Sequence, residues 1–266
     1  MLLANRVLPL EGGINFRDLG GYTTADGAQV RWGKLFRSGN MSTLTDQDYA
    51  YLRKLDIRSV CDFRSNSERI SSPTQVERFG SGIAYVSWDY DQVIDSSLLA
   101  GMFDGSDPAQ AATELMTGFY RGLPALFGAR FAIAFDALKQ GDGMVFHCSA
   151  GKDRTGMMAA LLLSALGVEE SQIFDDYDLT NRVLGSDEHS RRATGLSGKS
   201  EDPAMAMFAR MPPEAMEAFM GVKPDYLQAA FDSIRTMHGS VETYLDNALG
   251  LSEADITDLR THYLVR

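Results

Sequence analysis

The sequence predicts an α/β fold, and three observations lead to that prediction. Short apolar segments typical of strands occupy the first half of the chain, helical patterns alternate with them, and a block of helices closes it. The 266 residues are 44% hydrophobic and 23% charged, a globular composition that argues against disorder as the main state. We expect one domain over residues 1–266, because a chain of this length can bury a core without disulfides or metals.

The first third of the chain is predicted to hold strands joined by turns, together with one helix. Residues 14–19 lie between two pairs of glycines, which suit tight turns. Thr45 and Asp48 fit the cap of a helix over residues 45–55, whose apolar residues recur on one face. Strands are predicted over residues 34–37, 57–63 and 83–88.

From residue 108 onward the pattern is mainly helical. Two helices are predicted over residues 109–121 and 123–138, separated near Gly122 and Pro124. A short apolar strand, residues 144–147, comes next. The helix after it, residues 155–166, should end at Gly167, since glycine is common just past a helix C-terminus. Further helices are predicted over residues 169–183, 225–237, 241–249 and 252–264.

Residues 185–222 are predicted to form a flexible loop and a helical lid. The loop prediction rests on residues 185–199, which are rich in Gly, Ser and charge. Five methionines follow between Met205 and Met220. At helical spacing such a stripe is typical of a buried core, and a mobile lid is the alternative interpretation.

Net charge and cysteine content exclude several classes of protein. The 25 Lys and Arg against 36 Asp and Glu give a net charge of −11, which argues against binding to nucleic acid or to anionic lipid. Two cysteines, Cys61 and Cys148, are too few for a disulfide framework and indicate a reduced protein. The first residues lack a signal-peptide pattern, and no window has the ~18 apolar residues of a membrane span. We therefore expect a cytoplasmic protein.

The residues that indicate chemistry lie in segment 145–156, where an apolar strand runs through a loop of small residues into a helix. The backbone N–H groups of such a loop and the positive end of the helix make a nest for a dianion. Cys148 begins the nest, so the field that binds phosphate also stabilises its thiolate. Arg154 can hold two phosphate oxygens, Gly151 permits a positive φ, and Thr155 can donate its hydroxyl to the thiolate.

A thiolate that faces a bound phosphate indicates covalent catalysis. Cys148 would attack phosphorus in line and displace an alcohol or phenol, and water would then hydrolyse the phosphocysteine. Arg154 and the loop amides would hold the phosphate oxygens in the transition state. No metal or organic cofactor is expected, because these groups already supply positive charge.

Other interpretations of this segment fail on spacing. A nucleotide-binding loop needs Gly five positions before Gly151 and Ser or Thr directly after the lysine, whereas Phe146 and Asp153 stand there. A zinc site lacks a second pair of ligands. Adjacent residues of a strand point to opposite faces, so we interpret His147 as a buried structural residue rather than a base for Cys148.

The string His-Cys-x-x-Gly-Lys-Asp-Arg-Thr-Gly, residues 147–156, resembles the signature of the cysteine-dependent protein tyrosine phosphatases. The bacterial and fungal branch, with a lysine and an aspartate inside the loop, is also similar to this chain over residues 15–22, 35–38, 61–65, 176–181 and 226–245. This resemblance implies a central, mostly parallel sheet flanked by helices, with a helical lid. It also implies hydrolysis of phosphotyrosine, with phosphoserine, phosphothreonine or phosphoinositides as substrates of some members.

Matching positions transfer roles from the family to this chain. Cys148 matches the nucleophile and Arg154 the phosphate-binding arginine. The residues expected to bind phosphate are Ser149, Ala150, Gly151, Lys152, Asp153, Arg154 and Thr155.

The general acid, which protonates the leaving oxygen, stays open among several aspartates. The resemblance favours Asp62 at a strand end, and an ion pair with Arg64 or Arg37 is its alternative role. In order of preference the acids are Asp62, then Asp153 in the loop, then Asp89 and Asp91.

Two further groups of residues have alternative interpretations. Asn15 and Arg17 either pack on the phosphate loop or form a buried turn with Asp18; we favour the turn for Asp18 and leave Arg17 open. Strand alternation puts Cys61 and its neighbour in the chain on opposite faces, so we interpret Cys61 as a buried apolar residue rather than a redox partner of Cys148.

The leading hypothesis is a phosphomonoesterase acting on phosphorylated proteins or small phosphomonoesters, phosphotyrosine above all. A phosphoinositide phosphatase is the alternative, since Lys152 adds a cation to the loop. A non-catalytic phosphate-binding module is the third hypothesis, and the presence of both Cys148 and Arg154 argues against it. The sequence does not predict the oligomeric state.

Overall fold

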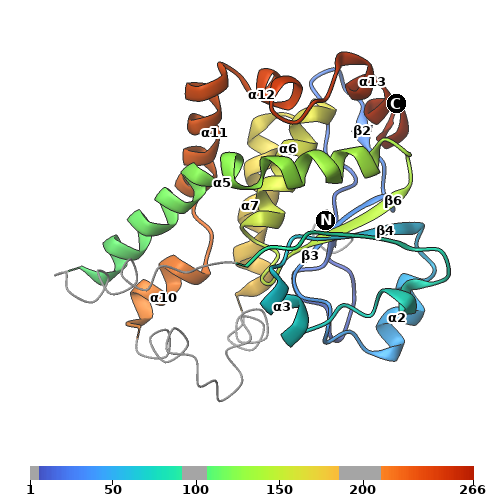
Figure 1. Cartoon of the computed structure of the whole chain (residues 1–266), viewed down its shortest axis with the longest axis horizontal. Helices are drawn as coiled ribbons and strands as arrows, with labels where there is room; N and C mark the ends of the chain where they lie inside the picture. Colours follow the sequence, from blue (N-terminus) through green and yellow to red (C-terminus); the bar gives the residue numbers. More distant parts are fainter. Residues whose placement is uncertain (1–5, 92–106, 186–210) are drawn as a thin grey trace.

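A five-stranded sheet forms the centre of the protein in a computed structural model that describes residues 6–91, 107–185 and 211–266 (Figure 1). The strands follow the order β1-β3-β6-β4-β5. Their bounds are β1 (Arg17–Asp18), β3 (Leu35–Ser38), β4 (Ile57–Asp62), β5 (Ala84–Ser87) and β6 (Gly143–His147). A separate pair joins β2 (Gln29–Val30) to β7 (Leu264–Val265) and so ties an early segment to the end of the chain.

The sheet is mostly parallel, as the sequence predicted. β3, β6, β4 and β5 run parallel to one another, and β1 pairs antiparallel with β3. Because parallel strands end at the same edge, Ser38, Asp62 and His147 lie side by side at the carboxyl ends of β3, β4 and β6. The loop that follows β6 starts at this edge, where α/β proteins place their ligand sites.

Helices make up most of the rest of the described chain. They are α2 (Asp46–Leu52), α3 (Asn66–Ser71), α5 (Pro108–Leu138), α6 (Arg154–Leu166), α7 (Glu170–Leu184), α10 (Pro213–Met220), α11 (Pro224–His238), α12 (Val241–Asn247) and α13 (Glu253–Tyr263), with a 3₁₀ helix, η1 (Val76–Phe79). Thr45 and Asp48 form the predicted capping box of α2. Gly167, with φ 84°, ends α6 as predicted.

The helices cover both faces of the sheet (Figure 1). On one face α5, α6, α11, α12 and α13 enclose the larger core, to which Phe146 of β6 belongs. On the other face α2 and η1 pack through Tyr49 and Phe79, together with Val145 of β6. Both faces of β6 are therefore buried, which explains its unbroken apolar run.

The prediction of two helices between residues 109 and 138 is wrong. The segment forms one continuous helix, α5, with Pro124 inside it. Proline removes one N–H donor from a helix. However, buried side chains on both sides of it, such as Met116 and Phe131, belong to the larger core. This shared packing outweighs the local break.

The predicted flexible loop and lid fall only partly on the described chain, because residues 186–210 lie outside it. In the part that is described, Met211 and, on α10, Ala215 and Ala218 pack with Ala112 of α5. Of the methionine stripe, Met211 is therefore part of a core, and Met216 packs against it partly buried. Among the described helices, none is both long enough and apolar enough to span a bilayer.

Candidate active site

The predicted phosphate loop joins β6 to α6 at the carboxyl edge of the sheet. β6 is buried along its length, Cys148 follows with 1% of its surface exposed, and α6 begins at Arg154. The first turn of α6 directs its unpaired N–H groups and the positive end of its dipole toward the loop. A buried thiol thus lies between a strand end and a helix N-terminus, as the sequence predicted.

Four successive carbonyl groups of the loop face polar atoms that lie outside it, and those of residues 149–151 accept hydrogen bonds there. Cys148 O lies 3.4 Å from His147 Nδ1, and Ser149 O accepts from the backbone N–H of Asn40 at 2.7 Å. Asn15 Nδ2 donates to Ala150 O at 3.3 Å and to Gly151 O at 3.0 Å. Gly151 O also accepts from Arg37 Nη2 at 2.8 Å. The N–H of a trans peptide points opposite to its carbonyl, and the described residues contain no cis peptide bond. The amides of residues 149–152 therefore point into the loop, where they can bind phosphate oxygens.

Two residues adopt left-handed conformations that this arrangement requires. Gly151 has φ 70°, and a Cβ there would lie 2.6 Å from backbone atoms of Ser38 and Gly39, so glycine alone fits against the end of β3. Asn15 has φ 51°, a value that asparagine tolerates better than most residues. Its side-chain oxygen accepts a hydrogen bond from Arg17 while its amide holds the loop.

Arg154 is held by acceptors from three residues. Nη1 and Nη2 pair with the two carboxylate oxygens of Glu68 at 2.7 and 2.8 Å. Nη1 also donates to the Phe63 carbonyl at 3.1 Å and to the Tyr90 hydroxyl at 3.0 Å. Nε has no hydrogen-bond partner among the described residues. One edge of the guanidinium is thus fixed, and the edge formed by Nε and Nη2 can bind phosphate.

Glu68, which the sequence analysis missed, is the main acceptor for Arg154. It is the third residue of α3, where it accepts from the Ser65 amide at 2.7 Å, and its Oε1 accepts from the Ser149 hydroxyl at 2.5 Å. Burial would raise the pKa of Glu68, but the hydrogen bonds and charge of Arg154 outweigh it and lower that pKa to about 2. The Ser-x-x-Glu pattern of residues 65–68 predicts a helix cap and gives no sign of this second role.

Lys152, Asp153 and Thr155 complete the predicted loop residues. Lys152 Nζ and the Tyr120 hydroxyl both donate to Asp153 Oδ1, each at 2.7 Å. The Asp153 side chain is 20% exposed, and no partner for its Oδ2 is found in the described chain. The Thr155 hydroxyl is buried and also lacks a partner within the described segments, so it remains available to the site.

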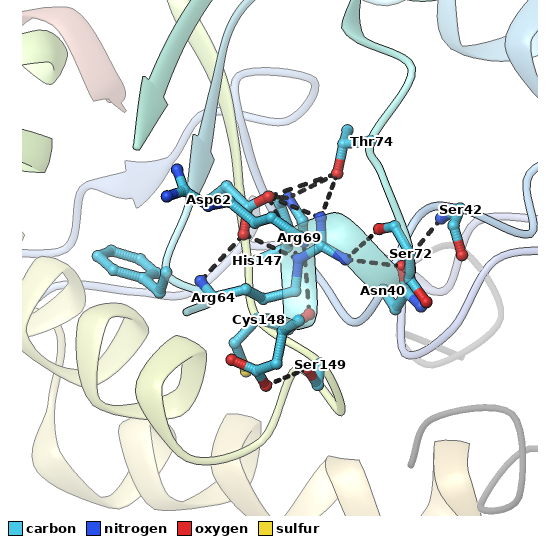
Figure 2. A network of polar contacts seen from close by, with 12 residues as sticks. Asn40, Ser42, Asp62, Arg64, Arg69, Ser72, Thr74, His147, Cys148 and Ser149 are labelled. Carbon is cyan, nitrogen blue, oxygen red and sulfur yellow. Dashed lines mark hydrogen bonds and ion pairs between the residues drawn. The ribbon is translucent and has the colours of Figure 1, made fainter. Parts of the chain in front are cut away.

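Asp62 lies behind the loop in a saturated network (Figure 2). Its oxygens accept from Arg64 Nε and Nη2 at 2.9 and 2.7 Å and from the Tyr85 hydroxyl at 2.8 Å, and lie 3.3 Å from His147 Nε2. Burial would raise the pKa of Asp62, but His147 and Arg64 bring it far below its ordinary value. The structure thus shows the ion pair with Arg64 that was the alternative role. Arg64 Nη1 continues the network to Asn40 at 3.1 Å, the residue whose amide holds the loop.

Asp89 and Asp91 lie at the surface. The Asp89 side chain is 94% exposed and pairs with Arg69 at 3.1 Å. Asp91 is exposed at the end of its described segment. Within residues 6–91 and 107–185, no hydrogen bond or ion pair joins either residue to the loop.

The residues between the two glycine pairs, 14–19, have different roles. Asn15 packs on the loop, whereas Asp18 accepts from two backbone amides in adjacent turns, each at 2.7 Å. The buried turn predicted for Asp18 is found, but these backbone amides hold it, in place of the predicted hydrogen bonds between Arg17 and Asp18. Arg17 contacts neither the loop carbonyls nor Asp18 and instead pairs with Asp176 of α7 at 3.2 Å.

Cys61 is a buried thiol in the larger core. It is 0% exposed and forms no disulfide. Burial raises the pKa of the Cys61 thiol well above its usual value, so this thiol stays neutral. Its interpretation as a small apolar residue is confirmed.

Comparison with known proteins connects this geometry to a family. A family model described as the tyrosine phosphatase family matches residues 8–265. The chain belongs to this family. The match includes the loop, the residues that hold its carbonyls, and Glu68. It confirms the predicted tyrosine phosphatase enzyme and a phosphorylated substrate.

Three relatives show how far the similarity extends. A Cupriavidus necator protein named as a predicted tyrosine-protein phosphatase is 34% identical over 256 residues, which are 94% of this chain and 85% of the relative. The triple specificity protein phosphatase PtpB of Mycobacterium tuberculosis is 32% identical, over 97% of this chain and 98% of the relative. A tyrosine-protein phosphatase of Nostoc commune is 26% identical, over 84% of this chain and 72% of the relative.

Proposed function

We propose that this tyrosine phosphatase hydrolyses phosphotyrosine, together with phosphoserine and phosphothreonine, through a phosphocysteine on Cys148. One observation carries the proposal: the inward amides of residues 149–152 and the fixed guanidinium of Arg154 belong to the loop that begins with this buried thiol. The name of the Mycobacterium tuberculosis relative, a triple specificity phosphatase, supports a substrate range beyond phosphotyrosine.

The chemistry consists of two displacements at phosphorus. The Cys148 thiolate attacks phosphorus, so an S–P bond forms while the P–O bond to the leaving oxygen breaks. The loop amides and Arg154 hold the three other phosphate oxygens, over which the transition-state charge is spread. Water then attacks the phosphocysteine, the S–P bond breaks, and inorganic phosphate leaves the regenerated thiolate.

Asp153 is the general acid in this proposal. It lies in the loop with Oδ1 held by Lys152 and Tyr120 and with its side chain partly exposed. It gives its proton to the leaving oxygen and takes one from the attacking water in the second step. Asp62 acts instead as the acceptor that holds Arg64 and His147, because its oxygens are already saturated and its carboxylate carries no proton.

The test compares variants on two aryl phosphates in the presence of a chelator. Cys148→Ser should abolish turnover. Asp153→Asn should slow hydrolysis of phenyl phosphate by about 100-fold, because its leaving group needs a proton. Hydrolysis of p-nitrophenyl phosphate should slow far less, because its leaving group needs none. Asp62→Asn is the matched control and should slow both substrates equally.

Three outcomes would contradict this reasoning. Turnover by Cys148→Ser would overturn the nucleophile. A leaving-group dependence in Asp62→Asn but not in Asp153→Asn would exchange the two aspartates. Loss of wild-type activity on chelation would overturn the cofactor-free mechanism.

A phosphoinositide is the second substrate class to test. Lys152 adds a cation beside the phosphate loop, which a ligand with several phosphates could use. In the structure this ammonium pairs with Asp153 at 2.7 Å, and the net charge of −11 does not favour an anionic membrane. Phosphotyrosine peptides should therefore turn over faster than soluble inositol-lipid headgroups, and the reverse order would favour the phosphoinositide.

The lid over residues 185–222, the single domain and the cytoplasmic location stay predictions. Support for the lid comes from Phe219 of α10, whose ring centre lies 5.9 Å from the Lys152 ammonium. Phe219→Ala should therefore speed alkylation of Cys148 by bulky reagents, and an unchanged rate would count against a lid at this position.

A further inference from the structure

A buried cluster of two arginines and one aspartate lies beneath the phosphate loop. Arg17 from β1 and Arg37 from β3 share the carboxylate of Asp176 from α7, with Arg17 Nε at 3.2 Å and Arg37 Nη1 at 2.5 Å. The three side chains are 0%, 0% and 1% exposed. We call this set the Arg17–Asp176–Arg37 cluster.

The cluster carries a surplus positive charge. Burial, with repulsion from Arg37, lowers the pKa of Arg17 to about 10, so Arg17 remains charged at neutral pH. Burial would raise the pKa of Asp176, but the two arginines outweigh it and bring that pKa to about 2. Two cations therefore share one anion in a buried environment, where an unbalanced charge is costly.

The surplus charge is in direct contact with the loop. Arg37 Nη2 donates to the Gly151 carbonyl at 2.8 Å, and Arg37 Nε is buried without a hydrogen-bond partner in the described residues. The other cations beside the loop each have their own carboxylate; the pairs are Arg64 with Asp62, Arg154 with Glu68, and Lys152 with Asp153. Among these cationic groups, the Arg17–Asp176–Arg37 cluster is thus the one with a positive charge that no carboxylate balances.

We propose that Arg37 is a positioning residue of the phosphate loop and that the anion held by the loop balances the surplus charge of the Arg17–Asp176–Arg37 cluster. That anion is the Cys148 thiolate in the free enzyme and the phosphate in the complex. Arg37 then acts in two ways: its charge favours the thiolate, and its bond to Gly151 directs the next amide into the loop. The inference rests on the proposed function, because it takes Cys148 as the nucleophile.

Several other charged or titratable groups lie around the loop, and two of them, Arg154 and Tyr90, interact electrostatically with Cys148. The groups around the loop are Arg154 of α6, Glu68 of α3, Tyr90 after β5, Asp62 and His147 at the ends of β4 and β6, Lys152 and Asp153 of the loop, and Tyr120 and Tyr177 of α5 and α7. The variants below leave all of these groups in place, so they report on the cluster.

The experiment measures alkylation of Cys148 by iodoacetamide against pH, with peptide mass spectrometry to separate it from Cys61. Arg37→Gln removes the charge and keeps an amide donor, so the pH midpoint of alkylation should rise by about one unit. At a pH below the midpoint, this shift means about tenfold less thiolate. Arg37→Lys keeps the charge, so its midpoint should stay near that of the wild type while kcat falls about tenfold from a misplaced loop. Arg260→Gln is the matched control, because Arg260 donates to the Ala165 carbonyl at the far end of α6, at 2.9 Å, and should change neither quantity.

Each outcome decides the proposal. A midpoint in Arg37→Gln equal to that of Arg260→Gln, or equal shifts in Arg37→Gln and Arg37→Lys, would overturn it. If Arg37→Gln does not fold, Arg17→Gln repeats the test, since it removes the same charge and leaves Arg37 on Gly151. A further measurement compares the Tm of the wild type with that of Cys148→Ser. The wild-type Tm should increase relative to that of the variant as pH rises through the midpoint. A Tm difference that stays constant with pH would overturn the charge balance. A wild type whose Cys148 is no more reactive than a free thiol would instead contradict the proposed function.

Discussion

The substitution Glu68→Gln tests whether Arg154 is held by charge. The change keeps the shape of the side chain and removes one negative charge. The carboxylate accepts two bonds from Arg154, one from Ser149 and one from the Ser65 amide. An amide has a single acceptor oxygen, and its NH2 group would face donors, so at least one of these bonds is lost.

The magnitude follows from the pKa of Glu68, which falls from 4.5 to about 2 on folding. At about 1.4 kcal/mol per pKa unit, the charged carboxylate contributes about 3 kcal/mol of stability. This contribution is fully present above about pH 4.5 and is lost as pH falls toward 2. Because the side chain is 26% exposed, solvent screening reduces the expected loss in Glu68→Gln to about 2 kcal/mol at pH 7. For a domain of this size the Tm should fall by about 4–8 °C.

Glu68→Gln should also reduce activity, and by more than the loss of folded protein explains. Without the carboxylate, the Arg154 guanidinium is no longer fixed on one edge, and its geometry toward phosphate is lost. We expect kcat/KM for a phosphotyrosine peptide to fall about 100-fold, measured at a temperature where both proteins are folded. Scanning calorimetry between pH 3 and 7 should also show a smaller change of Tm with pH in Glu68→Gln than in the wild type.

Ser65→Ala is the control that separates the two roles of Glu68. It removes the hydroxyl that caps α3, at a cost of about 1 kcal/mol, and leaves the bonds of Glu68 to Arg154 intact. Its kcat/KM should stay close to that of the wild type. Equal losses of kcat/KM in Ser65→Ala and Glu68→Gln, or wild-type kcat/KM in Glu68→Gln, would refute the reasoning.

Three further predictions concern the loop and its support. Asn15→Ala removes the donor to two loop carbonyls, so inhibition by vanadate should weaken about tenfold, and unchanged inhibition would contradict the inward amides. Gly156→Ala places a Cβ 3.2 Å from the Tyr177 ring; we expect a loss of about 1–3 kcal/mol in urea unfolding, and an unchanged midpoint would show that the ring moves freely. Thr155→Val deletes a buried hydroxyl without a partner in the described chain, so the Tm should hold or rise while kcat falls about tenfold with a burst of phenol release. A wild-type kcat would show that the hydroxyl is not used.

The position of the loop between β6 and α6 could be predicted from the sequence because the features that define it are local. A strand, small residues, Arg154 and a helix follow one another within a few positions, and Gly167 marks the helix end. The positions of most elements are confirmed for the same reason, whereas the mostly parallel sheet, also confirmed, was implied by the family resemblance. The two predicted helices around Pro124 failed because packing on the core, rather than local propensity, decides that segment.

The residues that support the loop could not be assigned from the sequence. Glu68 lies 86 residues from Arg154, and Asp176 lies 139 residues from Arg37. Each fits a local pattern, a helix cap and a helix interior, that accounts for it without the site. For Asp62, the local sequence suggested a catalytic role that the structure does not support. Its place at a strand end suggested an acid, whereas Tyr85 and His147, from distant segments, make it a fixed carboxylate.

The order of the cluster along the chain has a consequence for synthesis of the protein. Arg17 and Arg37 leave the ribosome first, Cys148, the proposed nucleophile, follows, and the shared Asp176 comes last; its contact with Arg17 spans 159 residues. Contacts of such long separation are slow to form, because a long loop must close first. Before α7 emerges, burial of the two arginines would leave them without a counter-charge, so we expect the nascent chain to keep them in water. We therefore expect the site to form only when most of the chain has been made.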